Sequence, residues 1–156
     1  MSCVFVNGVF DLLHDGHKEF LMQARALAIS MGGWHDQVVA AINSDRYARK
    51  LKGEKWGPGY PIDDERTRAM KLMRYADTIR IFDNEDQLYA LIGAYAPCIL
   101  CKGPDYAGKK VTGDDLCQVM ILNSPEPQSA KDLKREKYGL VSAVNRSTHV
   151  VADPDQ

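Results

Sequence analysis

The sequence predicts a single α/β domain, a three-layer sandwich built on a mostly parallel five-stranded sheet. Short β-rich runs alternate with segments whose apolar residues recur at helical spacing, and polar segments follow the β-rich runs. A chain of 156 residues with 45% hydrophobic side chains is long enough for one compact domain, so residues 1–156 are expected to form one unit. Strands that alternate with helices are joined by right-handed crossovers, which leaves the strands parallel and both faces of the sheet covered.

Five strands are expected from the β-rich runs. Each run is short and mostly apolar, as the buried strands of a parallel sheet are. The runs lie at residues 3–7, 37–43, 78–82, 98–102 and 140–144.

Three helices are expected between the strands, at residues 17–31, 63–76 and 84–95. The first stops at the Gly-Gly pair at 32–33, the second is opened by acidic residues, and the third ends before Pro97. Within the second, we expect Met70, Met73 and Tyr75 to face the core.

Ligands of such a sheet bind outside the carboxyl ends of the strands, where the strand order reverses. Four polar segments follow expected strands, at residues 7–17, 43–59, 102–115 and 145–151. A new helix is expected to begin at Thr112. Residues 118–137 include two prolines and many charged side chains, and we expect them to form a surface insertion.

Composition and charge exclude several classes of function. The formal net charge is -1 and there is no basic block, so a nucleic-acid surface is not expected. No apolar run approaches the roughly 20 residues of a membrane helix, and no signal-peptide core is present. We therefore expect a cytoplasmic protein without a membrane or nucleic-acid partner.

The four cysteines are too few and too irregularly spaced for a disulfide framework. Cys98 and Cys101 have a spacing that redox and zinc sites use, but they lie in an expected strand. Residues three apart on a strand point to opposite faces, so we interpret both as buried hydrophobic side chains.

His14 and His17 lie between the first strand and the first helix. Asp15 and Gly16 suit the cap and first turn of a helix, which would place His17 among free backbone amides at the positive end of the helix dipole. Two imidazoles there supply donors for a phosphate, and Gly8 and Gly16 allow close approach of the backbone. A purely structural role and a zinc site are the alternatives for this pair.

The stretch NGVFDLLHDGHKEFL resembles the HxGH signature of the cytidylyltransferase-like nucleotidyltransferases. NSDRYARKLKG, DERTRAMKLMRYAD and KGPDYAGKKVTG extend the resemblance in the same order. Over residues 3–113 the chain is most similar to the nucleotidyltransferase domains of bacterial ADP-heptose synthases, and next to the glycerol-3-phosphate cytidylyltransferases. The resemblance implies a Rossmann-like fold of the HUP, or adenine nucleotide alpha hydrolase-like, type.

The activity that this resemblance implies is nucleotidyl transfer. An acceptor phosphate oxygen attacks the α-phosphorus of a nucleoside triphosphate in line, and pyrophosphate leaves. The partners are ATP or CTP and a sugar phosphate or polyol phosphate, as in nucleotide-sugar biosynthesis, with Mg²⁺ as the cofactor. A homodimer is a further option that the resemblance raises.

The resemblance also assigns roles to individual residues, with His14, His17 and Lys52 as catalytic groups. Lys50, Lys52 and Lys55 are expected in a Gly-containing loop that folds over the site. No side chain is assigned as a direct metal ligand, although Asp11 is suited to orient an imidazole or to hold Mg²⁺ through water. The expected nucleotide-binding residues are Asn7, Gly8, Phe10, Asp11, Gly16, Arg66, Lys102, Gly103, Asp105, Arg146, Ser147 and Thr148.

The carboxyl-terminal part matches the family pattern least well. Arg146, Ser147 and Thr148 correspond to a Ser/Thr-rich signature that holds the β- and γ-phosphates, but the chain after them is too short for the usual final helix. A catalytically inactive nucleotide-binding module of the same fold is therefore one alternative to the transferase. A zinc-dependent structural protein built on His14, His17 and the cysteines is a second alternative.

Overall fold

The computed structural model describes residues 3–11, 13–32 and 37–122. Its centre is one five-stranded sheet in which every pair of neighbouring strands is parallel, in the order β3-β2-β1-β4-β5. The strands are β1 (Val4–Gly8), β2 (Val38–Asn43), β3 (Thr78–Phe82), β4 (Ile99–Lys102) and β5 (Gln118–Ile121). The predicted α/β fold class with a parallel sheet is confirmed.

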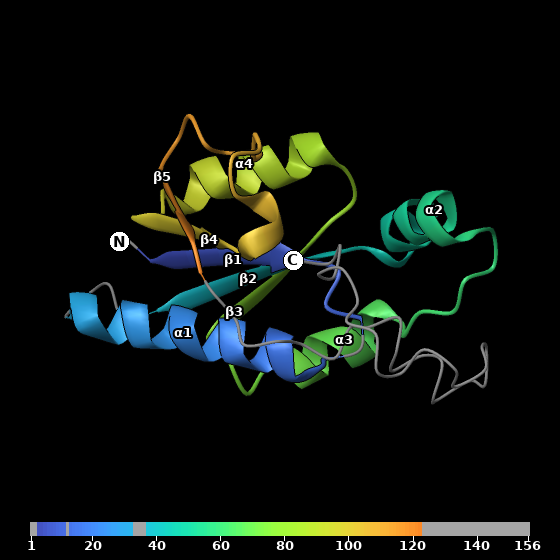
Figure 1. Ribbon diagram of the computed structural model, residues 1–156, viewed down its shortest axis with the longest axis horizontal. Helices are drawn as coiled ribbons and strands as arrows, with labels where there is room; N and C mark the ends of the chain where they lie inside the picture. The colour runs from blue at the N-terminus through green and yellow to red at the C-terminus, as the bar shows by residue number, and fades with distance from the viewer. Residues whose placement is uncertain (1–2, 12, 33–36, 123–156) are drawn as a thin grey trace.

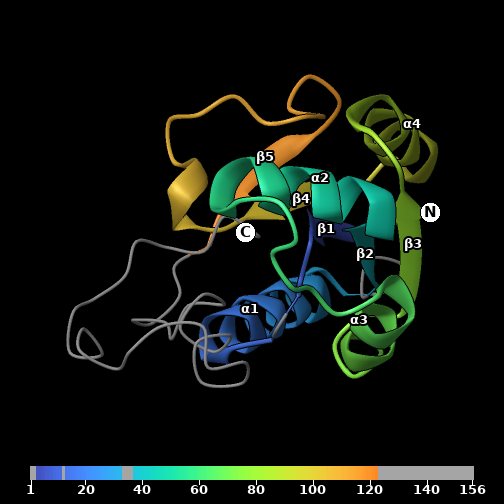
Figure 2. The same ribbon diagram turned by 90° about the vertical axis from the view of Figure 1, so that its right-hand side faces the viewer.

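Helices cover both faces of this sheet, as Figures 1 and 2 show. Helices α1 (Asp15–Met31) and α3 (Glu65–Leu72) lie on one face, and α4 (Glu85–Tyr95) lies on the other. Alternate residues of β1 serve the two faces: Val4 and Val6 pack in the cluster with α1, whereas Phe5 packs in the cluster with α4. The alternating β-rich runs therefore build the expected three layers.

Strand register brings the carboxyl ends of three neighbouring strands to one edge of the sheet. Val4 of β1 is level with Val38 of β2 and with Ile99 of β4, so the three strands start together and end within one or two residues of one another. The strand order reverses between β1 and β4, because the chain passes from β1 to β2 on one side and later returns to β4 on the other. This is the position where open α/β sheets bind ligands.

The fifth strand is not where the sequence predicted it. β5 begins at Gln118, inside the stretch expected to be a surface insertion, and pairs with β4 along its whole length. The start of that insertion was therefore wrong. Residues 123–137 and the expected strand at 140–144 lie outside the described residues.

The chain between β4 and β5 contains turns instead of the helix expected from Thr112. A short 3-10 helix, η2 (Pro104–Tyr106), follows β4, and the segment then turns back over α4. Gly113 has a φ of 93°, and a Cβ atom there would lie 2.7 Å from Cδ1 of Ile92. Glycine is required because the backbone rests directly on α4 in a left-handed conformation.

Helix α2 (Asp45–Trp56) replaces the loop that was expected to carry the lysines. Ser44 caps it, with its hydroxyl accepting a hydrogen bond from the backbone N–H of Tyr47 at 3.2 Å. Only Ala48 and Lys52 are buried on this helix, so it has no apolar stripe that would mark it in the sequence. Figure 1 shows α2 beyond the carboxyl ends of the strands.

Two expectations about packing are also corrected. Met70 and Met73 were expected in the core, yet they are 61% and 70% exposed and line an apolar groove beside the edge strand β3. Cys98 precedes β4, so strand alternation does not reach it, and it packs against the same cluster as Cys101.

The structure bears on the alternative in which the histidines and cysteines form a metal site. In these residues, no group of three or more His, Cys, Asp or Glu side chains is arranged to hold a metal ion. Burial raises the pKa of the Cys101 thiol to about 12, as expected for a thiol packed in an apolar core. None of the helices in the described ranges combines the length and the apolar character needed to cross a bilayer.

Candidate active site

The loop after β1 leads directly into the amino end of α1, where His14 is the N-cap residue. Its Nδ1 atom accepts a hydrogen bond from the backbone N–H of His17 at 3.2 Å. An imidazole that accepts through Nδ1 carries its proton on Nε2 when neutral. His14 therefore completes the cap of the helix through Nδ1, and in its neutral form it carries an N–H at Nε2.

The two imidazoles form a stacked pair inside the protein. Their ring centroids are 3.8 Å apart with an angle of 14° between the planes, and both rings are almost fully buried. Phe10 meets His17 edge-on at 5.5 Å, although its backbone is in the left-handed region with a φ of 49°. That conformation is unfavourable for a phenylalanine and persists because burial of its ring fixes the loop.

Asp11 ties this loop to the segment that precedes α3. Its side chain is fully buried, and Oδ1 accepts a hydrogen bond from the backbone N–H of Asp63 at 2.7 Å. The carboxylate, the two imidazoles and the amino end of α1 thus share one short stretch of chain. A negative charge is stabilised at such a helix end, and imidazole N–H groups add further donors.

Arg68 connects the ends of β1 and β2 from the core. Its guanidinium is fully buried and donates hydrogen bonds to the carbonyl oxygens of Val9 at 3.0 Å, Asn43 at 2.9 Å and Asp63 at 2.9 Å. A fourth bond, at 3.2 Å, pairs it with the carboxylate of Asp45. One side chain therefore holds three loops of the site in fixed relative positions.

The amino ends of α2 and α3 cap each other. The backbone N–H of Asp45 donates to Oε2 of Glu65 at 3.0 Å, and the backbone N–H of Glu65 donates to Oδ1 of Asp45 at 2.6 Å. This fixes α2 against the site and places Lys52, which is only 4% exposed, on its inner side. Lys50 and Lys55 are exposed on the same helix.

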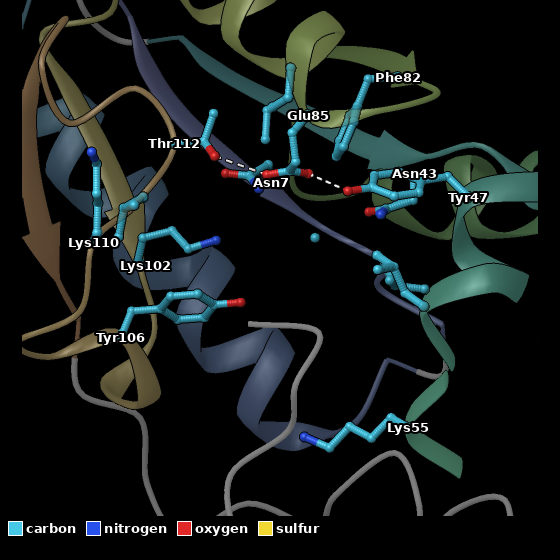
Figure 3. Close-up of a pocket in the computed structure, with 15 residues that line it drawn as sticks. Asn7, Asn43, Tyr47, Lys55, Phe82, Glu85, Lys102, Tyr106, Lys110 and Thr112 are labelled. Carbon is cyan, nitrogen blue, oxygen red and sulfur yellow. Dashed lines mark hydrogen bonds between the residues drawn. The ribbon is translucent and has the colours of Figure 1, made fainter. Parts of the chain in front are cut away.

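A cavity of about 390 Å³, lined by both polar and apolar side chains, lies at the carboxyl ends of the strands (Figure 3). It is on the α4 side of the sheet, because Phe82, Leu88 and Val111 of its lining belong to the core cluster of that face. The lining residues are Asn7, Gly8, Val9, Asn43, Tyr47, Leu51, Lys55, Phe82, Glu85, Leu88, Lys102, Tyr106, Lys110, Val111 and Thr112.

Lys102 is the buried cation of this cavity. It is 4% exposed, and its ammonium group lies 4.1 Å from the ring centroid of Tyr106. Within the described ranges, no carboxylate lies within salt-bridge distance of it. Burial lowers the pKa of Lys102 to about 8, while the more distant charge of Glu85 acts to raise it. An anion bound in the cavity would compensate the cost of burying this charge.

Glu85 is the acidic residue among those that line the cavity, and it joins two other segments to α4. One carboxylate oxygen accepts from the hydroxyl of Tyr47 at 2.7 Å and the other from the hydroxyl of Thr112 at 2.9 Å. Figure 3 shows these bonds crossing from α2 to α4 and on to the segment before β5. Burial, together with this hydrogen bond, raises the pKa of the Tyr47 phenol.

Many of the residues predicted from the sequence come together in two adjoining places. Asn7, Gly8 and Lys102 line the cavity, and Gly103 caps η2, which contains Asp105, beside it. The second place is the loop and first turn of α1, which contain Phe10, Asp11, His14, Gly16 and His17.

The remaining predicted residues are not in these two places. Arg66 is exposed on α3 and lines the apolar groove with Met70 and Met73, away from the residues that line the cavity. The three residues expected to hold the β- and γ-phosphates lie outside the described ranges; they are Arg146, Ser147 and Thr148.

Sequence reasoning missed Arg68 and the Glu85 side of the cavity. Arg68 precedes the buried Leu72 by one helical turn, so the spacing placed it on the inner face of α3. Tyr47 and Glu85 stand in the first turns of the helices that follow β2 and β3, where a parallel sheet collects its ligand-binding residues. Both signals are present in the sequence.

The fold and the site together define an α/β protein with a cavity at the strand-order reversal and, at the same end of the sheet, a helix end suited to phosphate. Residues 5–137 match the model of the cytidylyltransferase-like family, and the chain belongs to that family. The family expected from the HxGH stretch is thereby confirmed.

Curated relatives and solved structures agree with this assignment. The chain is 37% identical over 139 residues to the bifunctional protein HldE of Wolinella succinogenes, which covers 87% of this chain and 27% of that protein. It is 42% identical over 118 residues to the bifunctional protein HldE of Azorhizobium caulinodans, covering 74% of this chain and 22% of that protein. The chain thus spans about a quarter of the length of these relatives.

Two solved structures share the fold. A lipopolysaccharide core biosynthesis protein from Thermoplasma volcanium matches 80% of this chain and 97% of its own length, with a TM-score of 0.54 and 24% identity. A macrolide-efflux protein from Streptococcus pneumoniae matches 81% of this chain and 47% of its own length, with a TM-score of 0.57 and 23% identity.

Proposed function

We propose that this chain is a nucleotidyltransferase that moves a nucleotidyl group from ATP or CTP to a sugar phosphate or polyol phosphate and releases pyrophosphate. The observation that carries the proposal is the stacked pair of His14 and His17 at the amino end of α1, at the same end of the sheet as the cavity that the buried Lys102 lines. Membership of the cytidylyltransferase-like family supports the same reaction class.

The reaction forms one bond and breaks one. A phosphate oxygen of the acceptor attacks the α-phosphorus, and the bond from that phosphorus to the bridging oxygen of the β-phosphate breaks, so pyrophosphate carries away the electron pair. No covalent intermediate with the protein is needed, and the protein acts by positioning the reactants and neutralising charge.

Each group of the site has a task in this scheme. His14 uses Nδ1 to cap the helix and donates a hydrogen bond from Nε2 to a phosphate oxygen. The N-terminal amides of α1 and the imidazole of His17 stabilise the negative charge that develops on the transferring phosphoryl group. Lys52 and Lys102 are nearly buried cations on two other sides of the site, and both neutralise phosphate oxygens.

The residues around the loop fit a magnesium ion that is held mainly by the nucleotide. Mg²⁺ commonly keeps several waters and binds through one or two carboxylates together with substrate phosphates, and Asp11 supplies a buried carboxylate in the loop that leads to the imidazoles. When bound, the ion would screen the negative charge of the triphosphate.

The homodimer raised by the family resemblance stays a prediction. Sedimentation of the full chain measures its oligomeric state.

Pyrophosphate release tests the proposed function. The full chain is incubated with Mg²⁺ and each of four nucleoside triphosphates, crossed with a hexose 1-phosphate, a pentose phosphate and glycerol 3-phosphate. We expect release with one nucleotide and one acceptor class, and loss of release in His17→Ala. If the nucleotides bind but are recovered intact with every acceptor, the chain is an inactive nucleotide-binding module and the proposal is wrong.

A further inference from the structure

The cavity has two chemically different sides. Lys102, Tyr106 and Lys110 lie on one side, and Asn43, Tyr47 and Glu85 lie on the other (Figure 3). The first side offers ammonium groups, whereas the second offers a carboxylate and neutral polar groups. A ligand that fills the cavity should therefore carry negative charge at one end and hydrogen-bond donors at the other.

The side around Glu85 is an array of hydrogen-bond acceptors. A carboxylate has about four acceptor positions. The hydroxyls of Tyr47 and Thr112 occupy two of those of Glu85. Because each hydroxyl has given its single proton to Glu85, its oxygen faces other groups as an acceptor. We call these three residues, Tyr47, Glu85 and Thr112, the hydroxyl-binding wall.

Asn7 adds to this preference for donors at the floor of the cavity. Its side-chain oxygen Oδ1 is buried and has no hydrogen-bond partner among the residues that the structure describes. A buried acceptor without a partner is costly, and a donor from a bound ligand removes that cost.

The imidazole pair and the cavity lie on opposite faces of the sheet. The imidazole pair follows Phe10, which packs in the α1 cluster, whereas the cavity is built on the α4 cluster. The cavity reaches the carboxyl end of β1 at Asn7 and Gly8, and the loop that leads to the imidazole pair starts from the same end of that strand. An in-line transfer places the attacking and leaving oxygens on opposite sides of the phosphorus, so one ligand is expected on each face.

We propose that the hydroxyl-binding wall holds the hydroxyl groups of the acceptor's carbon chain, and that Glu85 selects a polyhydroxylated sugar phosphate over a smaller polyol phosphate. This inference rests on the proposed function and names the residue that determines the choice of acceptor. The phosphate of the acceptor lies toward Lys102, because the carboxylate of Glu85 repels an anion. An ionised carboxylate only accepts hydrogen bonds, so sugar hydroxyls bind Glu85 as donors. Because a charged acceptor makes a stronger hydrogen bond than a neutral one, the negative charge of Glu85 should determine how tightly the sugar is held.

The test is calorimetric titration of inorganic phosphate, glycerol 3-phosphate, ribose 5-phosphate, mannose 1-phosphate, ATP and CTP into the full chain, each ligand separately. We compare wild type with Glu85→Gln, which keeps the shape and removes the charge, and with Tyr47→Phe. Asp86→Asn is the matched control, since Asp86 is an exposed acid in the same first turn of α4 and does not line the cavity.

The expected result is that wild type binds the sugar phosphates more tightly than inorganic phosphate. Glu85→Gln should lose roughly tenfold or more in affinity for them while keeping its affinity for inorganic phosphate, and Asp86→Asn should resemble wild type. Equal losses for inorganic phosphate and the sugar phosphates would overturn the inference. So would a loss confined to ATP or CTP, which would assign the wall to the ribose of the nucleotide.

The inference and the proposed function can fail separately. If sugar phosphates bind in a Glu85-dependent way but no pyrophosphate is released, the transferase function is wrong and the hydroxyl-binding wall stands. If pyrophosphate is released at the wild-type rate and with the wild-type acceptor preference in Glu85→Gln, the wall is wrong and the transferase function stands.

Discussion

His14 caps the helix that carries His17 and stacks on its ring: Nδ1 of His14 lies 3.2 Å from the backbone nitrogen of His17, and the ring centroids are 3.8 Å apart. One imidazole therefore has two duties, to end the helix correctly and to present Nε2–H to the site. Substitutions can separate these duties, because other side chains cap a helix equally well.

Replacement of His17 by Ala should lower kcat by about two powers of ten or more, because it removes one donor to the transferring group. Steady-state pyrophosphate release measures the rate, and circular dichroism with thermal unfolding shows whether the fold is kept. Near-normal turnover in a folded His17→Ala variant would exclude His17 from the mechanism.

His14→Asn isolates the catalytic duty of His14 from its capping duty. Asparagine is a strong N-cap, so its stability should equal that of wild type, whereas His14→Ala should lose about 1 kcal/mol. Both variants should lose pyrophosphate release to a similar extent. Urea unfolding and initial rates are the measurements, and a fully active His14→Asn would limit His14 to capping.

A comparison of Lys52 with Lys50 tests whether only the inward-facing lysine of α2 contributes to catalysis. Lys52 is nearly buried on the inner side of α2, whereas Lys50 is exposed. Lys52→Ala should lower kcat/KM by roughly tenfold to a hundredfold, as expected when a charge-assisted contact of about 1.5 to 3 kcal/mol is lost. Lys50→Ala is the control and should keep the wild-type value; equal effects of the two variants would contradict the assignment.

Arg68 and Arg66 form a similar pair on α3. Arg68→Ala should reduce the free energy of unfolding by about 2 to 4 kcal/mol, because it leaves two buried carbonyl groups, one half-buried carbonyl group and a carboxylate without this donor. Arg66→Ala should change it by less than about 0.5 kcal/mol. If Arg68→Ala does not fold, Arg68→Lys in urea gives the comparison, and stability equal to that of Arg66→Ala would refute the role.

Because Lys102 is buried, we expect the free energy of unfolding to depend on pH. Burial lowers its pKa from the ordinary 10.5 to about 8, so between these values the unfolded chain binds more protons and stability from this group rises with pH. Lys102→Met should then be more stable than wild type at pH 7, by on the order of 3 kcal/mol, and the difference should vanish above pH 10.5. Unfolding at several pH values measures this, with the exposed Lys110→Met as the control.

The sequence by itself determined the α/β class, four of the five strands and the anion-suited end of α1. These features are local: β-rich runs, helical spacing and a capped helix start are all contained in a few consecutive residues, such as His14 to His17. Helix α2 was not predicted because only Ala48 and Lys52 are buried on it. β5 was not predicted because it is an edge strand in which none of the four residues is fully buried, unlike the equally short but buried β4.

Only the tertiary structure decided which polar side chains meet. Tyr47 and Thr112 reach Glu85 across 38 and 27 residues of chain, and Arg68 reaches Val9 across 59. Such contacts follow from the strand order β3-β2-β1-β4-β5 and its register, which bring separate loops to one edge of the sheet. Local periodicity carries no information about that order, because it repeats identically in every strand and helix.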